Sequence, residues 1–302
     1  EDLELILHPM AEDAKEAIGS MGDDTPLAVL SDRYRPLYHF FRQNFSQVTN
    51  PAIDSLRENK VMSLKTRFGN LGNILDFDTL TKENIYVLNS PVLSNSQFHK
   101  FLNFDNLTKQ NIYVLNSPVL SNSQFDKFTN FFGKNSKSID CTFSEDESLS
   151  SAILRIQKES EIAARQGVTQ IILTDKNLSS KKLPMPTVLC VGAINTFLIN
   201  KKLRGYVSIN VQSGEALDTH SFATLIGVGA TTINPYLAFD SLHQRFEKKL
   251  FGQLDYDDCV KRYIKSVNSG LLKIMSKMGI SVLSSYRGGC NFETVGLSRT
   301  IV

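Results

Sequence analysis

The second half of the chain alternates between short apolar runs and longer amphipathic stretches. Runs such as Ile171–Leu173 are typical of buried strands, whereas apolar residues three and four apart, as in 149–156, mark one face of a helix. Strands are therefore predicted near 141–143, 168–174, 206–211, 230–233 and 280–283, and helices near 144–166, 186–200, 215–227, 235–248 and 257–278.

Residues with known end preferences support several of these limits. Ser144 and Glu147 have the spacing of a capping box, and Gly167 suits the left-handed position that follows a helix. Pro186 suits the first turn of a helix. Asn234 stands immediately before the next predicted helix, so its side chain is expected to cap that helix.

The order of these elements predicts the fold class. A strand followed by a helix and another strand, with loops of about 2–6 residues, is typical of parallel β/α units. Four or five units in succession favour a barrel-like or part-barrel arrangement, with an open doubly wound sheet as the alternative. The predicted class is therefore α/β, with parallel β/α units in a barrel-like or part-barrel arrangement.

The first half of the chain contains a near-identical tandem repeat. Residues 77–101 and 104–128 align at an offset of 27 residues and differ at only three of 25 positions. Solenoid repeats diverge and need about three copies to share a core, so this pair is more typical of a recent in-frame duplication or a sequence error. Each copy reads as a short strand followed by a turn that could cap a short helix. One fold has one place for this unit, so we expect one copy to occupy it and the other to be extruded as a surface hairpin or loop.

Composition and charge exclude several classes of protein. Of 302 residues, 41% are hydrophobic and 21% charged, which is typical of a globular protein. A net charge of +2 argues against nucleic-acid binding as the main function. No apolar run approaches the roughly 18 residues that span a membrane, and no signal or transit peptide is visible. The chain starts without methionine, so we expect it to be cut from a longer protein.

The cysteine and histidine residues form no metal-binding pattern. The four cysteines, Cys141, Cys190, Cys259 and Cys290, are 31 or more residues apart. We expect reduced, mostly buried thiols. An iron–sulfur cluster held by this chain alone is not expected, because cluster cysteines occur in close runs. The five histidines are scattered and are expected to be structural or solvated.

Two predicted strand ends carry residues that could do chemistry. Ser213 is followed by Glu215, Asp218 and His220, but the glycine pattern of a hydrolase nucleophile is absent, so capping of the next helix by Ser213 is the preferred interpretation. Arg287-Gly288-Gly289 follows the last predicted strand, and its backbone amides could hold a phosphate. A self-contained β/α-barrel enzyme that binds a phosphate-bearing ligand near Arg287–Gly289 is therefore an alternative function.

Residues 18–58 combine glycine and polar residues with five aromatic ones, which suggests a wall that is both packed and polar. The stretch contains the motifs Met21–Pro26 and Gln43–Pro51, and later motifs are Ser213–Glu215, His220–Gly227, Ala230–Ala238 and residues 263–288. Together these motifs resemble the central domain of glutamate synthase. Where the family has proline, this chain has Ala52 and Ser55, and residues 289–292 replace an Ala-Gln-Ile-Phe run.

The resemblance implies a place within a larger enzyme that makes two glutamates from glutamine, 2-oxoglutarate and a reductant. In that family an N-terminal amidotransferase domain releases ammonia. A later β/α-barrel domain binds FMN and an iron–sulfur cluster and converts 2-oxoglutarate through 2-iminoglutarate to glutamate. The central domain joins the two and helps to wall the ammonia tunnel. Residues 1–302 are then the central domain, with 279–302 a possible junction to the FMN-binding domain, and this chain alone is expected to bind no cofactor and to be inactive.

The resemblance also suggests site residues. Ammonia must remain unprotonated, so a tunnel wall should be largely apolar with a few neutral polar groups. Met21 and Thr49 are the residues that we place on the tunnel wall; the alternative is that Met21 packs and Thr49 forms a turn. The residues expected to anchor this motif are Asp23, Asp24, Asn50 and Arg57.

The electron donor and the compartment follow from weaker signals. Abundant Asn, Lys, Ile and Ser are typical of AT-rich genomes such as those of algal plastids, which favours ferredoxin as the partner and a plastid (chloroplast stroma) location. A reduced nicotinamide donor and a cytoplasmic location are the alternative. A regulatory or docking module without a tunnel role is a further possible function.

Overall fold

The computed structural model describes residues 2–17, 27–44, 50–68, 113–289 and 291–298. The chain divides into two compact units, Glu1–Thr66 together with Leu115–Val302, and Arg67–Val114. The second unit is described only at its ends, through β2 (Thr66–Phe68) and β3 (Tyr113–Leu115), which pair as a two-stranded sheet.

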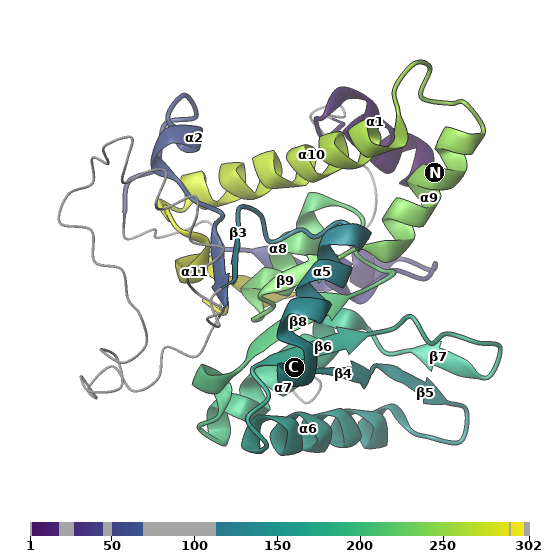
Figure 1. Ribbon diagram of the computed structural model, residues 1–302, viewed down its shortest axis with the longest axis vertical. Coiled ribbons are helices and arrows are strands. Elements are labelled where there is room, and N and C mark those ends of the chain that lie inside the picture. Colours follow the sequence, from purple (N-terminus) through teal and green to yellow (C-terminus); the bar gives the residue numbers. More distant parts are fainter. Residues whose placement is uncertain (1, 18–26, 45–49, 69–112, 290, 299–302) are drawn as a thin grey trace. The chain divides into compact units, whose positions relative to one another are not determined.

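The first unit is built around a parallel sheet of four strands in the order β4-β6-β8-β9 (Figure 1). Every residue of β6 is buried, as expected for a parallel strand covered on both faces. Val119 extends the row through a parallel bridge to Ile233 of β9. The strands are β4 (Ser136–Asp140), β6 (Gln170–Thr174), β8 (Ser208–Gln212) and β9 (Thr232–Asn234).

Helices connect successive strands of this sheet. α6 (Leu149–Arg165), α7 (Thr187–Asn200) and α8 (Thr219–Gly227) each lie between two consecutive parallel strands. A buried apolar cluster joins them to the sheet, with Ile156, Ile194 and Phe222 fully buried. The predicted parallel β/α units are therefore confirmed, and within the described residues the row of strands is open, as in a part-barrel.

The remaining elements surround these units. The long helix α10 packs against α1, α2, α8 and α9, as Figure 1 shows. The remaining elements of the first unit are η1 (Leu3–Leu7), α1 (His8–Asp13), η2 (Ala28–Leu30), η3 (Leu37–Phe40), β1 (Phe41–Gln43), α2 (Glu58–Val61), α5 (Asn122–Phe132), η5 (Gly133–Asn135), β5 (Thr142–Ser144), β7 (Lys182–Pro184), η6 (Arg204–Tyr206), α9 (Tyr236–Glu247), α10 (Tyr256–Lys277), α11 (Leu283–Tyr286) and β10 (Phe292–Thr294). No helix in the described part is long and apolar enough to cross a membrane.

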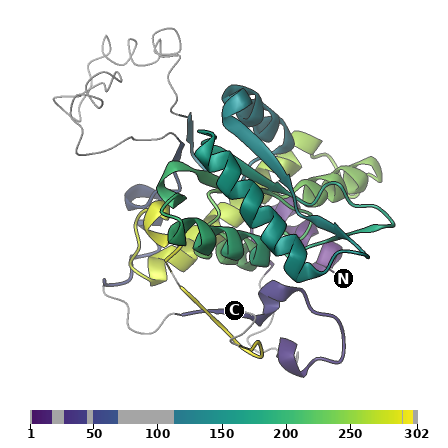
Figure 2. The ribbon, with the colours of Figure 1, turned by 90° about the horizontal axis from the view of Figure 1, so that it is seen from below.

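An early and a late segment of the first unit pair in a short antiparallel ladder. β1 pairs with β10, with Phe41 opposite Thr294 and Gln43 opposite Phe292. Figure 2 shows the blue-purple N-terminal segment beside the yellow C-terminal strand. Residues about 250 positions apart are thus held together at one place.

The strand predicted near 141–143 is confirmed but lies outside the main sheet, and the strand predicted at 280–283 is wrong. Residues 142–144 form β5, which pairs antiparallel with β7 and not with the main sheet. The first strand of that sheet is β4, whose sequence Ser-Lys-Ser-Ile-Asp carries only one apolar residue and gives no strand pattern. The segment 280–283 is not a strand; it leads into the short helix α11, and only Val282 makes an isolated bridge, with Ser63.

Several predicted helix ends also need correction. Ser148, and not Ser144, caps α6, since its Oγ accepts from the Ser151 amide at 3.2 Å. Asn234 is not a cap but the last residue of β9, and its side-chain amide donates to the Leu120 carbonyl at 3.0 Å. Asp218, and not Ser213, caps α8. The expected helix end at Gly167 is confirmed by its φ of +83°.

The second copy of the repeat supplies part of the first unit. It contributes Val119 beside β9, and α5, whose start has a complete capping box between Ser121 and Gln124. Phe125 and Phe128 on this helix are buried. The first copy, 77–101, lies outside the described residues, so its extrusion stays a prediction.

Candidate functional site

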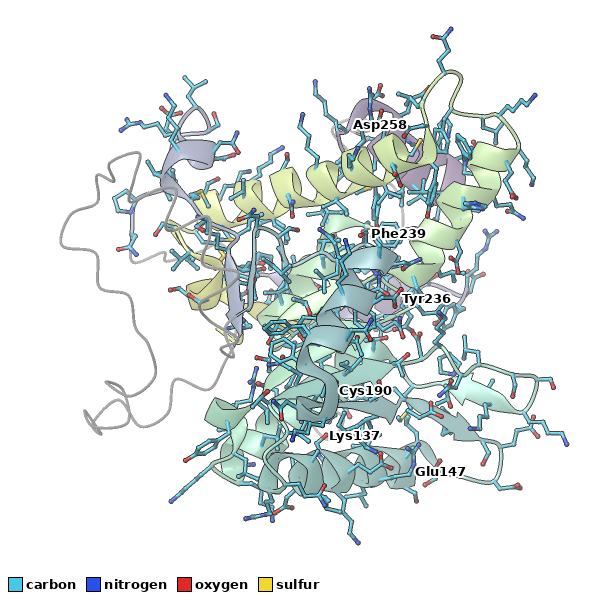
Figure 3. All side chains as sticks on the ribbon, in the orientation of Figure 1. Lys137, Glu147, Cys190, Tyr236, Phe239 and Asp258 are labelled. Atoms are coloured by element: carbon cyan, nitrogen blue, oxygen red, sulfur yellow. The ribbon has the colours of Figure 1, made fainter. Side chains whose placement is uncertain are left out.

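A buried polar cluster lies where β6 and β8 end. Asp175 follows β6 and is only 3% exposed. Its Oδ2 accepts from Ser213 Oγ at 3.0 Å, and its two carboxylate oxygens accept from the Gly214 amide at 3.0 and 3.1 Å. The Tyr236 hydroxyl is a further partner; Figure 3 marks Tyr236 at the start of α9. Burial raises the pKa of Asp175 despite these hydrogen bonds.

A second carboxyl group extends this cluster to α7. Glu215 Oε2 accepts from the amide of Thr187, the first residue of α7, at 2.8 Å, and burial raises the pKa of Glu215. The Thr187 hydroxyl in turn lies 2.7 Å from Ser213 Oγ. A carboxyl group at a helix N-terminus satisfies a free amide and interacts favourably with the helix dipole. The cluster therefore fastens the loop after β8 to α7.

The same geometry argues against a hydrolase. His220 does not contact Ser213; its Nε2 lies 2.9 Å from the carbonyl oxygen of Tyr38. Ser213 Oγ is engaged with Asp175, Thr187 and the Glu215 amide. A serine nucleophile needs a base within hydrogen-bond distance, so these residues do not form a catalytic triad.

A second polar region surrounds the described start of the family-like motif at residues 43–51. Gln43 Nε2 donates to the carbonyl of Asn291 at 2.9 Å, and the Asn44 amide donates to the same carbonyl at 2.8 Å. The hydroxyl of the fully buried Tyr286 donates to Gln43 Oε1. The residues just before 45–49 are thus held by α11 and by the segment that leads into β10.

The residues just after 45–49 are fastened to the end of α10. The Ile53 amide donates to the Ser276 carbonyl at 2.8 Å. Gly279 has a φ of +67°, and a Cβ atom there would lie 2.7 Å from both Cβ and the carbonyl oxygen of Asn50. Ser276 Oγ also donates to Glu58 Oε1 at 2.6 Å. Both described flanks of residues 45–49 are therefore anchored at neighbouring parts of the fold, largely through neutral polar groups.

The predicted site residues fall into two groups. Four of them lie outside the described residues: Met21, Asp23, Asp24 and Thr49. Asn50 is described and packs against Gly279, whereas Arg57 is 71% exposed and pairs at 3.8 Å with Asp54. Gln43, Tyr286 and Ser276 were not predicted as anchors, although the Gln43-Asn44 amide pair inside the motif was a usable signal.

The predicted backbone phosphate site is wrong. The amides of Arg287, Gly288 and Gly289 donate to the carbonyls of Leu283, Ile226 and Tyr286 at 3.0, 3.1 and 3.2 Å. Since all three amides are used within the fold, none is free for a phosphate. The alternative of a self-contained enzyme loses the backbone-amide site on which it rested.

The described cysteines do not gather into a metal site. Cys141, Cys190 and Cys259 are free and buried, and within the described part no group of three or more His, Cys, Asp or Glu residues could hold a metal ion. Cys190, marked in Figure 3, shares a thiol–thiol hydrogen bond with Cys141, which together with burial raises its pKa. These residues do not fit an iron–sulfur cluster, which needs four ligands close together.

Comparison with protein families gives a match over nearly the whole chain. The family model described as the glutamate synthase central domain matches residues 1–114 and 103–298, and the two matches overlap within the repeated segment.

Curated relatives agree over the full length of this chain. It is 52% identical to the glutamate synthase [NADPH] large chain of Azospirillum brasilense and 41% identical to that of Bacillus subtilis, covering 18% of each. It is 39% identical to the ferredoxin-dependent glutamate synthase of Pyropia yezoensis, covering 19% of it. The chain thus spans about a fifth of the length of these relatives.

Solved structures give a weaker likeness. The flavin-binding domain of baker's yeast flavocytochrome b2 is 13% identical, with a TM-score of 0.38, over 74% of this chain and 53% of that one. A likeness at this level carries no argument about function.

Proposed function

Because this chain belongs to the glutamate synthase central domain family, we propose that it is the connecting domain of a glutamate synthase. In this role it joins an amidotransferase domain to an FMN-binding domain of the same polypeptide and helps to wall the passage for ammonia between them. The whole enzyme would convert glutamine, 2-oxoglutarate and a reductant into two glutamates. The chain alone would not catalyse this reaction.

The observation that carries the tunnel role is the neutral anchoring on both sides of residues 45–49. Gln43 and Tyr286 hold one flank, while Ser276 and Gly279 hold the other. A carboxylate at the lumen would stabilise ammonium, which is trapped and cannot act as a nucleophile. The nearby carboxylate of Glu58 is already engaged by Ser276 Oγ. The anchoring therefore suits a wall that must not protonate its cargo.

Met21 and Thr49 are proposed to face this passage. The test is Met21→Ala and Thr49→Val in the full-length enzyme, measuring glutamine hydrolysed and glutamate formed in the same reaction. We expect more than one glutamine hydrolysed per synthase turnover, because ammonia escapes. Leu56→Ala, at a side chain that is 85% exposed, is the matched control and should leave the ratio at one. One-to-one coupling at an unchanged rate in both variants would exclude this placement.

Asp23, Asp24, Asn50 and Arg57 are proposed as anchors of the same motif. Of the two that are described, Asn50 is supported by its packing against Gly279. Arg57 is supported less, because its ion-pair partner is the neighbouring Asp54 and its side chain is mostly exposed. Asn50→Gly removes the Cβ atom that lies against Gly279, so it should impair coupling more than Arg57→Gly in the same assay.

FMN and an iron–sulfur cluster are proposed for the full-length enzyme only. When bound, they would supply the electrons that reduce the product of ammonia addition to 2-oxoglutarate. A visible absorption spectrum of the 302-residue chain, taken after incubation with FMN and desalting, should be flat. Retained flavin absorbance would contradict this assignment.

Two combinations of electron donor and compartment are candidates. The composition favours ferredoxin and a plastid location, and chloroplastic ferredoxin-dependent relatives exist in Spinacia oleracea and Oryza sativa. The higher identity to two bacterial NADPH large chains, 52% and 41%, favours a nicotinamide donor and a cytoplasmic location. Synthase activity measured with reduced ferredoxin and with NADPH decides between them.

A further inference from the structure

Arg204 occupies a partly buried position at the amino-terminal edge of the sheet. Its Nε donates to Asn195 Oδ1 at 2.6 Å, its Nη1 to the Val207 carbonyl at 2.6 Å, and its Nη2 to the Gly229 carbonyl at 2.9 Å. Val207 and Gly229 lie just before β8 and β9. All three acceptors are neutral, and an arginine has five N–H groups, so two remain free.

Arg287 reaches the same place from the other end of the sequence. It follows α11, and the next residue, Gly288, donates its amide to the Ile226 carbonyl at 3.1 Å. A Cβ atom on Gly288 would lie 4.0 Å from the Cα of Gly229, whose carbonyl Arg204 binds. The Arg287 guanidinium makes no hydrogen bond or ion pair with another described residue.

The two guanidinium groups lack a counter-charge within the described part of the chain. Burial lowers the pKa of Arg287, and burial together with the nearby Arg287 lowers the pKa of Arg204 to about 10. Four other arginines of the described part are paired with carboxylates, among them Arg155 with Glu147 and Arg245 with Glu4. Two neighbouring cations that are partly removed from water are unfavourable unless an anion lies between or beside them.

We propose that Arg204 and Arg287 together hold an oxyanion beside Gly229, at the amino-terminal edge of the sheet. The planar fork of an arginine matches the oxygens of a carboxylate or a phosphate, and the free N–H groups of the pair can form bidentate contacts. The oxyanion has two possible sources. It is either a free phosphate or the carboxylate of an acidic residue elsewhere in a longer polypeptide. In the Azospirillum brasilense relative, about four fifths of the polypeptide lies outside the region that matches this chain.

The test uses the full-length protein and three variants. Arg287→Gln removes the charge, Arg287→Lys keeps it, and Arg165→Gln is a matched control at an exposed arginine that pairs with Glu161 on the surface. Binding of radiolabelled inorganic phosphate is measured by equilibrium dialysis. Thermal unfolding is measured in phosphate and in chloride at equal ionic strength. Neither readout depends on glutamate synthesis, so the result is independent of the proposed function.

Two results would support the site and would identify its source. If the anion is free phosphate, the wild type binds it with a dissociation constant at least about tenfold lower than Arg287→Gln, and phosphate raises the melting temperature of the wild type and not of Arg287→Gln. If the anion is a carboxylate of the protein, phosphate has no effect. Arg287→Gln then lowers the melting temperature by about 2–4 °C, while Arg287→Lys and Arg165→Gln change it by less than half as much.

Two results would overturn the proposal. In the first, Arg287→Gln matches the wild type in both phosphate binding and melting temperature. In the second, phosphate has no effect and Arg287→Lys lowers the melting temperature as much as Arg287→Gln. That outcome would show that the packing of the side chain matters and its charge does not.

Discussion

Phe128 and Phe101 are the equivalent phenylalanines of the two copies of the repeat. We predict that replacement by alanine destabilises the protein strongly at Phe128 and hardly at all at Phe101. Phe128 is fully buried on α5, with its ring centroid 6.4 Å from that of Phe125 and 5.0 Å from that of Phe132. Replacing a buried phenylalanine by alanine costs about 3–5 kcal/mol. Phe101 belongs to the copy that we expect to be extruded, so Phe101→Ala should change the free energy of unfolding by less than about 0.5 kcal/mol.

Exchange of the two copies would not relieve the loss in Phe128→Ala. If the first copy took the place of the second, the connection between β2 and β3 would shorten from 44 to 17 residues, a gain of about 0.8 kcal/mol. The connection between α5 and β4 would lengthen from 3 to 30 residues, a cost of about 2 kcal/mol. The exchange would also put Asp105 at the buried position of Phe132, which costs several kcal/mol more. The exchanged form is thus at least as unfavourable as the cavity left by Phe128→Ala.

The assay is urea unfolding of the wild type and both variants, followed by far-ultraviolet circular dichroism. With a slope of about 3 kcal/mol/M, the midpoint of Phe128→Ala should fall by about 1 M or more, and that of Phe101→Ala should not move. Equal losses in both variants would mean that both copies are packed, and a loss confined to Phe101→Ala would mean that the copies have been assigned the wrong way round.

Three further predictions concern the connection between β2 and β3, the carboxyl group of Glu215 and the turn at Gly279. Deleting residues 77–103 shortens the connection between β2 and β3 from 44 to 17 residues and should stabilise the chain by about 0.8 kcal/mol in urea; a loss of several kcal/mol would contradict the extrusion of one copy. Burial raises the pKa of Glu215, so the folded protein holds this proton to a higher pH than the unfolded chain, whose glutamate pKa is about 4.3. The contribution of Glu215 to the free energy of unfolding therefore falls as the pH rises from about 4.3 to the folded pKa. When the free energy of unfolding is measured between pH 4 and 7, Glu215→Gln should not show this fall. Gly279→Ala should lower the free energy of unfolding by at least about 1–2 kcal/mol, because φ is +67° and the new Cβ would collide with Asn50. The control is Gly192→Ala in α7, where nothing lies within 4 Å of the new Cβ, and it should raise the free energy of unfolding by up to about 1 kcal/mol. If thermal unfolding shows the same change in both variants, the packing of Asn50 on this turn is refuted.

The order of β/α units could be predicted because each buried strand is a short apolar run and each helix has one apolar face. β6 shows this most clearly, since all five of its residues are buried. β4 could not be predicted, because it has one neighbour in the sheet and only Ile139 of its five residues is buried. The end of the chain was misread for a related reason: the apolar residues Val282 and Leu283 fit a strand equally well, and only tertiary packing turned Leu283 into the first residue of α11.

The candidate site was less predictable than the fold. The sequence motif pointed to Asn50, whose neighbour Gly279 is 229 positions away and could not be identified from spacing. The approach of Arg204 to Arg287 likewise depends on the turn at Gly229 and on the loop after α11. Sequence patterns describe neighbours along one element, and contacts of this kind exist only after several elements have packed.

The ladder between β1 and β10 has a consequence for the order of assembly during synthesis. Phe41–Gln43 cannot pair until Phe292–Thr294 has left the ribosome, about 250 residues later. At about 5–20 residues per second, this delay lasts about 12–50 s. During this time the β/α units between them can already fold, whereas the flanks of residues 45–49 have no Asn291 or Ser276 to bind. An interrupted or truncated chain would therefore keep most of its sheet and lack the anchored motif, so a conduit that depends on this motif would form only in chains that have been completed through the domain.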